Sequence, residues 1–337
     1  ILIFFIFTVR IRFNRRARAI ASAQERLQPL VRQWLVGVSE AKDVRDMLAS
    51  FAPSVARDVA IRFSQAALPD AKSKALAGLV RYDAWYRDAI EESRSWFWWR
   101  RLEAARLIAE LGTRADEGVV RKLLMDKHAA VRVGASAALR KVATPALIEL
   151  VLDELPDQPL VVRSYQLLLL RDQWRMARDV LLPRLTTDAP VLALPHWLNV
   201  AEALGLPELL DAATQLAEHT SPNVRLAVAR ALRGYFHPST PKILGAMLTD
   251  TDWRVRAQAA RSLGVLGDPS IVSVLATCLT DRNWWVRFRS ALSLCQLGEP
   301  GRRALRSMRD GSDPYAAQMA SMVSGLSPGS VLELTEA

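Results

Sequence analysis

The amino-acid sequence predicts an all-α fold, an α-solenoid of stacked two-helix repeats with a period of 31 residues. An arginine recurs at this interval, or once at twice this interval, and an aspartate precedes most of these positions by six residues. No stretch shows the sustained alternation of a β-strand. A fixed period near 30 residues is typical of helical units that bury their apolar faces only by stacking on neighbours. The arginines are Arg101, Arg132, Arg163, Arg225, Arg256 and Arg287, and the aspartates are Asp126, Asp157, Asp188, Asp250 and Asp281.

An uncharged run opens the chain and a basic cluster follows it. Nine helical residues span roughly 14 Å, about half of a bilayer's hydrocarbon core. We expect residues 1–20 to be the end of a membrane-spanning helix that starts upstream of Ile1, plus a basic juxtamembrane segment. The alternative is that residues 1–9 form the first buried helix of the solenoid. The basic residues are Arg10, Arg12, Arg15, Arg16 and Arg18.

These five arginines also predict a location. Positive charge next to a membrane span favours the cytoplasmic side. We therefore expect the rest of the chain on the cytoplasmic face of an inner membrane, with the arginines attracting anionic lipid headgroups at roughly 1 kcal/mol each.

The remaining chain divides by its repeat pattern. Residues 21–95 have a helical composition without the 31-residue period, so we expect an irregular helical N-terminal cap with breaks at Pro29, Pro53 and Pro69. Residues 96–326 carry the repeat array. Residues 327–337 begin with a Ser-Pro-Gly-Ser sequence and are predicted to be a disordered tail.

The repeat unit is clearest over residues 250–279. Apolar residues such as Val255 and Leu263 recur there at helical spacing, and Gly264, Gly267 and Pro269 are expected to separate two short amphipathic helices. Small alanines on the first helix would allow neighbouring helices to approach closely.

With this spacing the sequence resembles the HEAT repeats, and specifically the short HEAT-like type also seen in phycobilisome lyases. The resemblance rests on the D-x5-R spacing, on Val-Arg pairs such as 255–256 and 286–287, and on A-x-x-x-L-G endings, over roughly residues 96–326. It implies that the loop aspartates and the following arginines form a ladder between adjacent repeats. The implied ladder residues are Asp126, Asp157, Asp250 and Asp281 with Arg132, Arg163, Arg256 and Arg287.

Three units depart from this pattern. Leu194 occupies one arginine position, His219 replaces the aspartate before Arg225, and Gln318 follows Arg287 in register. We expect these units to be less regular, or to be ends of the array.

A second stripe on each first helix is the candidate protein-docking ridge. It lies two, five and nine residues after the ladder arginine, positions that share one helix face. In the family that the chain resembles, the corresponding helices line the concave surface. The alternative is a solvated face that binds nothing. The residues predicted to bind a partner are Arg106, Tyr165, His196, Arg230, Arg261 and Arg289.

The ten tryptophans gather at defined repeat positions. Trp98, Trp253 and Trp284 lie three residues before a ladder arginine, and Trp99 occupies the next position. Regular placement favours packing at helix starts. Since tryptophan is also common in binding hot spots and at the membrane interface, Trp98 and Trp99 are candidate binding residues as well.

Composition argues against several classes of chemistry. Half of the net charge of +10 comes from the five arginines of residues 10–18, so the array itself is only mildly basic. Cys278 and Cys295 form no metal or redox motif. We find no phosphate-binding loop and no nucleophile elbow, and we expect no catalytic residue, metal or cofactor.

The sequence therefore favours a non-enzymatic, membrane-anchored scaffold that organises or regulates a partner complex. By analogy, an inner-membrane polysaccharide synthase, hence a glycosyltransferase, or a secretion assembly is a plausible partner. Arginine-rich, lysine-poor usage is typical of a bacterial protein from a GC-rich genome. The alternative is a nucleic-acid-binding protein or an enzyme of the DNA glycosylase or bilin lyase type, for which we find no matching motif.

Overall fold

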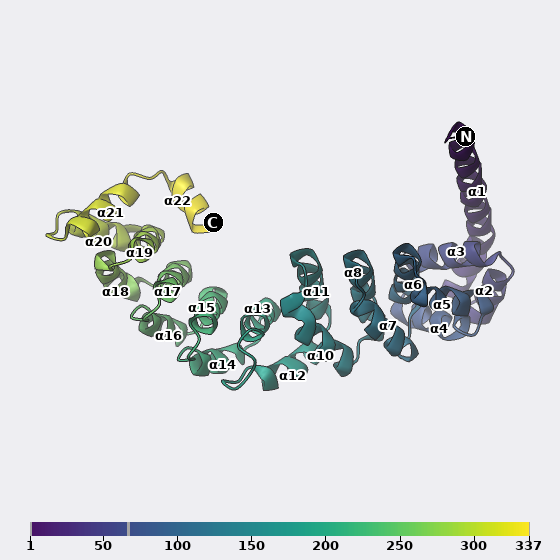
Figure 1. The fold of residues 1–337 in the computed structure, drawn as a ribbon, viewed down its shortest axis with the longest axis horizontal. Coiled ribbons are helices and arrows are strands. Elements are labelled where there is room, and N and C mark those ends of the chain that lie inside the picture. The colour runs from purple at the N-terminus through teal and green to yellow at the C-terminus, as the bar shows by residue number, and fades with distance from the viewer. Residues whose placement is uncertain (1, 66–67, 337) are drawn as a thin grey trace. The chain divides into compact units, whose positions relative to one another are not determined.

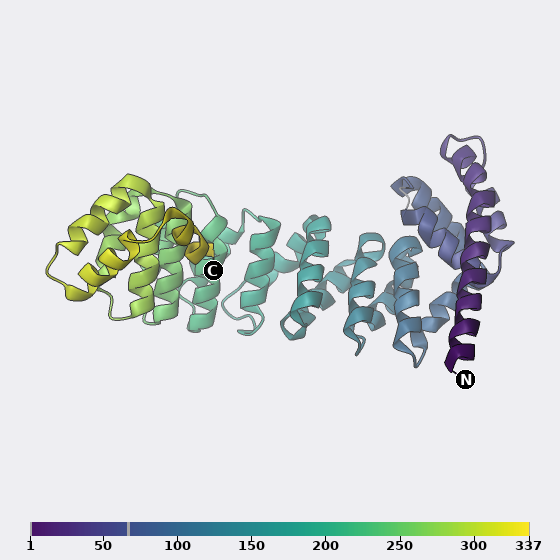
Figure 2. The ribbon, with the colours of Figure 1, turned by 90° about the horizontal axis from the view of Figure 1, so that it is seen from above.

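The computed structural model describes residues 2–65 and 68–336, with side chains at residues 14–65, 68–69 and 71–335. As predicted, the chain is an all-α solenoid, and no strand occurs among the described residues. The chain divides into two compact units, residues 1–176 and residues 177–337, with α12 (Trp174–Leu181) at the division. Each unit is a stack of helices, visible in Figure 1 and Figure 2.

Unit 1 combines the N-terminal cap with the first repeats. Its first-of-pair helices α6, α8 and α11 pack side by side. The helices are α1 (Leu2–Leu35), α2 (Ala41–Ala49), α3 (Pro53–Gln65), α4 (Asp70–Val80), α5 (Ala84–Glu91), α6 (Trp98–Leu111), α7 (Glu117–Leu124), α8 (Ala129–Ala137), α9 (Leu139–Val142), α10 (Pro145–Glu154) and α11 (Leu160–Asp172), with a 3₁₀ turn η1 (Glu92–Arg94) before α6.

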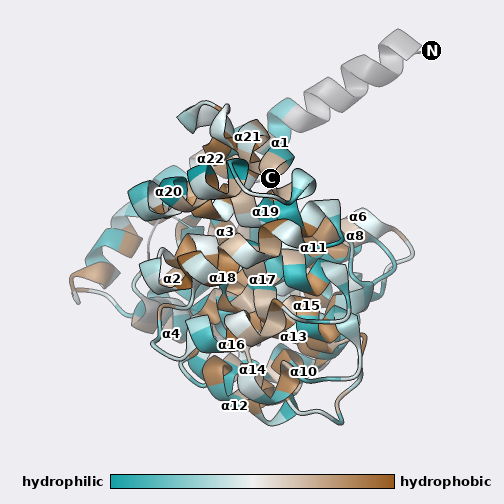
Figure 3. Cartoon of the chain, turned by 90° about the vertical axis from the view of Figure 1, so that its left-hand side faces the viewer, coloured by the Kyte–Doolittle hydropathy of each residue, from teal (hydrophilic) through white to brown (hydrophobic). Residues whose placement is uncertain are grey.

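Unit 2 contains the most regular repeats. Helices α13, α15, α17, α19 and α21 pack in sequence, each against the next. The helices are α13 (Leu194–Leu204), α14 (Leu209–Leu216), α15 (Pro222–Ala231), α16 (Thr240–Met247), α17 (Trp253–Leu266), α18 (Val272–Thr277), α19 (Trp284–Gln296), α20 (Gly298–Arg309), α21 (Pro314–Ser324) and α22 (Pro328–Glu336). Figure 3 colours α20, which carries four arginines, largely as hydrophilic.

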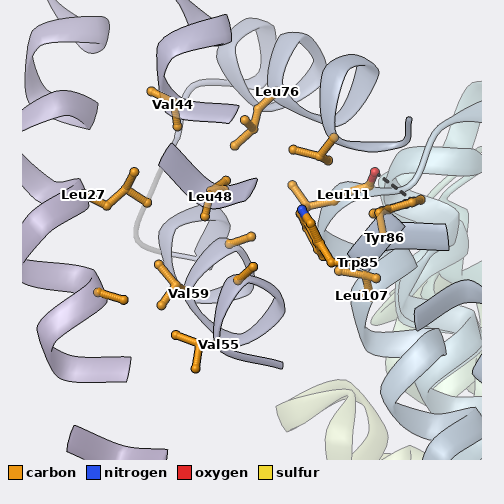
Figure 4. Packing of buried hydrophobic residues seen from close by; sticks show 14 of the residues in the cluster. Leu27, Val44, Leu48, Val55, Val59, Leu76, Trp85, Tyr86, Leu107 and Leu111 are labelled. Carbon is orange, nitrogen blue, oxygen red and sulfur yellow. Dashed lines mark hydrogen bonds between the residues drawn. The ribbon is translucent and has the colours of Figure 1, made fainter. Parts of the chain in front are cut away.

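Helix α1 corrects the expected break at Pro29, which lies inside the helix. The helix also runs without interruption through the expected boundary between residues 20 and 21. An internal proline costs a helix about 3 kcal/mol. A buried stripe offsets this cost, because it packs α1 onto the core of the cap, shown in Figure 4. The stripe is Ile20, Ala23, Leu27, Val31 and Trp34, spaced three or four residues apart.

Close approach of α17 and α19 explains why glycine lies within the repeat. Gly264 is inside α17 and does not separate two helices as expected. A Cβ at this position would lie 2.5 Å from the Ser293 Oγ of α19, and that hydroxyl donates to the Ala260 carbonyl at 2.8 Å. The separation occurs at Gly267 instead, which adopts φ +72° and ends α17.

The C-terminal segment corrects a second expectation. Where the sequence predicts a disordered tail at residues 327–337, the structure has α22 packed against α19. The polar Ser-Pro-Gly-Ser sequence forms the start of this helix, since Ser327 Oγ accepts a hydrogen bond from the Ser330 amide at 3.1 Å. The helix ends with Thr335 buried.

Candidate protein-docking surface

Ladder arginines join consecutive repeats. Arg256 donates from Nε and Nη2 to the two Asp281 oxygens at 2.7 and 2.8 Å, and from Nη1 to the Asp250 carbonyl at 2.8 Å. Arg225 contacts Asp250 in the same way, at 2.6 and 2.8 Å. Each arginine therefore connects the loop of its own repeat to the aspartate of the next one, 25 residues on.

The ladder aspartates also organise their loops. Asp281 accepts a hydrogen bond from the Asn283 amide at 2.7 Å, and Asp250 accepts one from the Asp252 amide at 2.8 Å. Burial opposes ionisation of these carboxyls, but the arginine and amide donors together hold the pKa of Asp250 and Asp281 below its usual value. These carboxylates are structural parts of the ladder.

Arg287 differs from the implied ladder, because it donates to the Asp281 carbonyl at 2.7 Å and lies 5.2 Å from the Tyr315 ring centroid instead of pairing with a further aspartate among the described residues. At two other ladder positions a residue other than aspartate takes part. Arg132 donates to Gln158 Oε1 at 2.8 Å, while the expected partner Asp157 is exposed. His219 replaces an aspartate by accepting the Ser221 amide on Nδ1 at 3.0 Å, and its carbonyl accepts from Arg225 at 2.7 Å. A different side chain thus maintains each loop.

The predicted ridge of unit 2 forms an arginine cluster. Burial lowers the pKa of Arg261, and the nearby charges of Arg289, Arg233 and Arg230 lower it further. Burial also lowers the pKa of Arg289. The structure therefore brings together Arg230, Arg261 and Arg289, as the sequence predicts, and adds Arg233, which the sequence reasoning missed.

Helix α22 lies against part of this ridge. Arg261 Nη2 donates to the Thr335 carbonyl at 2.5 Å, and Arg289 Nη1 donates to the Leu334 carbonyl at 2.7 Å. Carbonyl groups of a last helical turn lack helical partners and carry partial negative charge. Arginines 261 and 289 thus hold the end of α22, while Arg230 remains exposed.

A pocket of about 350 Å³ with both polar and apolar lining adjoins the cluster between α13 and α15. His196 and Arg230, both predicted ridge residues, line it together with Asn199 and Glu202. Burial raises the pKa of Glu202, against the opposing effect of Arg233 and Arg230. Exposed Val191 and Leu192 add an apolar wall.

The ridge residues of unit 1 belong to a different environment. Arg106 is exposed on α6 and pairs with Glu103 at 3.1 Å. Tyr165 lies half-buried on α11. The described contacts of unit 1 bring neither residue into an arginine cluster.

The tryptophans are more exposed than the packing interpretation suggests. Trp98, Trp99, Trp253, Trp284 and Trp285 each retain between 39% and 50% exposure at the starts of α6, α17 and α19. Trp98 also packs, since its ring stacks on His128 with centroids 4.1 Å apart. Both interpretations therefore apply to the same side chains.

The basic N-terminal segment is described only in part. Arg15, Arg16 and Arg18 are exposed, and Arg16 pairs with Asp58 at 2.7 Å. Arg10 and Arg12 lie outside the described side chains. Within the residues that the structure describes, no helix has both the length and the apolar content to cross a bilayer. The predicted anchor thus receives no support from the described helices.

A family model described as HEAT repeats matches residues 240–323. Over these residues the chain is similar to HEAT repeats. The matched HEAT repeats contain α16 to α21, with the Arg256–Asp281 ladder pair and the ridge residues Arg261 and Arg289. The family prediction made from the sequence is confirmed for this segment.

Solved structures give weaker likenesses. A structure of Kap95p with RanGDP aligns at 15% identity over 88% of this chain and 51% of that one, with a TM-score of 0.44. YibA of E. coli aligns at 15% identity over 86% and 98%, with a TM-score of 0.36. Human deoxyhypusine hydroxylase aligns at 16% identity over 76% and 96%, with a TM-score of 0.32. None of these scores reaches 0.5, so they carry no argument about function. No curated protein matches the chain.

Proposed function

We propose that this chain is a non-enzymatic scaffold that binds an acidic surface of a partner protein through the ridge of unit 2. The arginine cluster carries this proposal, because Arg230 and Arg233 extend it beyond Arg261 and Arg289, which hold the end of α22. Cations close to one another and partly withdrawn from water repel each other, and an acidic partner would relieve that repulsion. Complementary charge of this kind gives specificity and fast association.

The adjoining pocket supplies features of a binding site that charge alone lacks. It places a half-buried carboxyl, Glu202, beside Arg230 and an exposed apolar wall. Interfaces combine apolar anchors with a few oriented polar groups. We propose that a partner side chain inserts between α13 and α15 while its acidic surface lies over the arginines.

Capture of the partner tests the docking surface. We would attach a purification tag to the C-terminus of the natural protein through a flexible linker, solubilise membranes in mild detergent and identify the proteins that co-purify. Arg230→Glu with Arg233→Glu should abolish capture. The matched control reverses two exposed arginines of the same unit that lie on α20, Arg303→Glu with Arg309→Glu, and should leave capture intact. Equal capture by both variants would remove the ridge from consideration.

We further propose that the scaffold is tethered to the cytoplasmic face of an inner membrane and serves a membrane complex there. The support is the uncharged run of residues 1–9, followed by a basic segment whose Arg15 and Arg18 are exposed. A polysaccharide synthase or a secretion assembly is the partner that we would look for first. Protein expressed from its natural start codon should stay with membranes after alkaline carbonate washing, and its release would contradict the tether.

A further inference from the structure

Four consecutive aromatic residues form an exposed patch at the start of α6, on the side of unit 1 where α6, α8 and α11 begin. We call this patch, Trp96 to Trp99, the aromatic end. Trp96 is 86% exposed, and the other three retain between 39% and 50% exposure. Exposed aromatic clusters of this size mark interaction surfaces in soluble proteins.

The fold holds the aromatic end in a fixed conformation. Buried Arg101, which pairs with Asp126, also donates from Nη1 to the Ser95 and Trp96 carbonyls at 2.9 and 3.0 Å. Phe97 stacks on Trp99 with ring centroids 4.5 Å apart, and Trp98 stacks on His128 of the next repeat. Hydrogen bonds from the ladder arginine therefore fix the backbone that carries these exposed rings.

Two cationic side chains lie beside these rings. Lys127 Nζ lies 5.4 Å from the ring centroid of Trp96, and the Arg100 guanidinium lies 5.8 Å from that of Phe97. Nearby carboxylates already have partners: Glu91 pairs with Arg94, Glu92 with Arg57 and Asp126 with Arg101. The aromatic end therefore combines apolar rings with cationic charge.

A chain of contacts places the aromatic end on the same side of unit 1 as Arg16 of α1. Arg16 of α1 pairs with Asp58 of α3, and the adjacent Arg57 pairs with Glu92 of η1, three residues before Ser95. At the other end of α3, Ser64 donates to the Glu110 carbonyl near the end of α6. Helices α3 and α6 therefore run in the same direction, and Arg16 of α1 lies against the first half of α3.

The same edge of the stack is apolar further along. Leu160 and Val161 lie 62 residues after Trp98 and Trp99, which places them at the same repeat position on α11. They are 68% and 74% exposed. Helix α8 packs between α6 and α11, so the helix starts form one continuous edge.

We propose that the aromatic end of unit 1 lies in the headgroup layer of an anionic bilayer, so that the membrane orients the scaffold as well as tethering it. Tryptophan rings favour the interface between hydrocarbon and water, and arginine and lysine close to anionic headgroups contribute roughly 1 kcal/mol each. Arg15, Arg18, Arg100 and Lys127 supply that charge. The inference rests on the proposed membrane tether, and its test separates the two.

Environment-sensitive labels on two sides of unit 1, where α6 begins and where α6 ends, test this orientation. We would introduce Trp96→Cys into full-length protein whose native cysteines are alanine, attach an NBD fluorophore and reconstitute the protein into phosphatidylcholine vesicles containing phosphatidylglycerol. The matched control is Tyr82→Cys. Tyr82 is 73% exposed and also has an arginine beside its ring, but it lies at the opposite end, because the adjacent Arg81 bonds Thr113 just beyond the end of α6.

We expect a blue shift and stronger emission at position 96, a smaller change in vesicles of phosphatidylcholine alone, and no change at position 82. Because Trp96→Cys removes one ring, Arg94→Cys provides a second reporter that leaves all four rings in place. Unchanged NBD emission at positions 94 and 96, or equal spectral shifts at positions 96 and 82, would overturn the inference. A shift with native membranes but none with protein-free vesicles would also overturn it, in favour of a protein partner.

Vesicle flotation distinguishes failure of the inference from failure of the tether. Protein that floats and resists carbonate but leaves position 96 silent keeps the tether and refutes the orientation. Protein that shifts at position 96 but is released by carbonate keeps the orientation and refutes the tether. Protein that does not float with anionic vesicles refutes both.

Discussion

Two sets of arginines in unit 2 lie only a few residues apart and have opposite environments. Arg256 in the ladder has its pKa raised, chiefly by its hydrogen bonds to Asp281, against the opposing effect of burial. Arg261, five residues later on the same helix, has its pKa lowered by burial and by neighbouring arginines. The ladder arginine has a carboxylate partner within the fold, whereas Arg261 lies among other cations and donates to a carbonyl of α22.

The largest effect should come from breaking the ladder. Arg256→Ala leaves the Asp281 carboxylate half-buried without its guanidinium partner, and loss of one member of a buried pair costs about 3–5 kcal/mol. Urea unfolding of the full chain, monitored by circular dichroism, measures this cost. The control Arg303→Ala, which removes an exposed side chain of α20, should change stability by less than about 0.5 kcal/mol. A similar small value for Arg256→Ala would contradict the structural role of the ladder.

A ladder position with a neutral partner should cost less. Arg132 donates to the Gln158 amide oxygen and to the Asp126 carbonyl, so Arg132→Ala removes hydrogen bonds from a charged donor without leaving an unpaired carboxylate. Such bonds are worth about 1.5–3 kcal/mol. The same unfolding experiment should place this variant between Arg256→Ala and the control. Equal costs at Arg132 and Arg256 would show that carboxylate burial is unimportant.

Ridge substitution should have a smaller and local effect. Arg289→Ala removes one hydrogen bond from a charged donor to the end of α22, which is worth about 1.5 kcal/mol, the low end for charged donors, because Arg289 is only half-buried. Amide hydrogen exchange should rise in α22 and stay unchanged in α17. If Arg289→Ala lowered the free energy of unfolding of the whole chain as much as a ladder variant does, the ladder and ridge arginines would not differ in role.

The pH dependence of stability should show the smallest difference between ladder and ridge variants. The folded-state pKa of Asp250 and Asp281 is lowered, so their stabilisation is complete above the unfolded-state pKa of about 3.9 and is lost as pH falls through the folded-state pKa. Stability should therefore decline below about pH 4. Asp281→Asn should reduce the slope of this decline, by an amount that corresponds to the uptake of at most one proton on unfolding. Arg289→Ala should leave the slope unchanged. Identical slopes in the two variants would assign the acid sensitivity elsewhere.

Much of this architecture could be predicted because it repeats. The D-x5-R period predicts the helix pairs, and the ridge spacing brings Arg230, Arg261 and Arg289 together correctly. Arg233 was missed because α15 ends at Ala231 and continues as a 3₁₀ turn, in which the helical spacing behind the ridge no longer holds. Gln158 could not be chosen over Asp157, since only the packed loop decides which side chain reaches Arg132.

Tertiary packing decided the features that have no period. Pro29 is tolerated because Leu27 and Val31 on either side of it are buried against the cap. The tail folds as α22 because α19 and two ridge arginines contact it. Local composition predicts neither result, since each depends on residues far away in the sequence.

The ladder also bears on how unit 2 would respond to mechanical force. Arg225 and Arg256 each connect their own loop to the aspartate 25 residues on. Under tension, a repeat at one end can therefore detach while the next repeat keeps its own pair. An optical trap should record a sawtooth of extension, with roughly 100 Å of chain released for each repeat of about 31 residues.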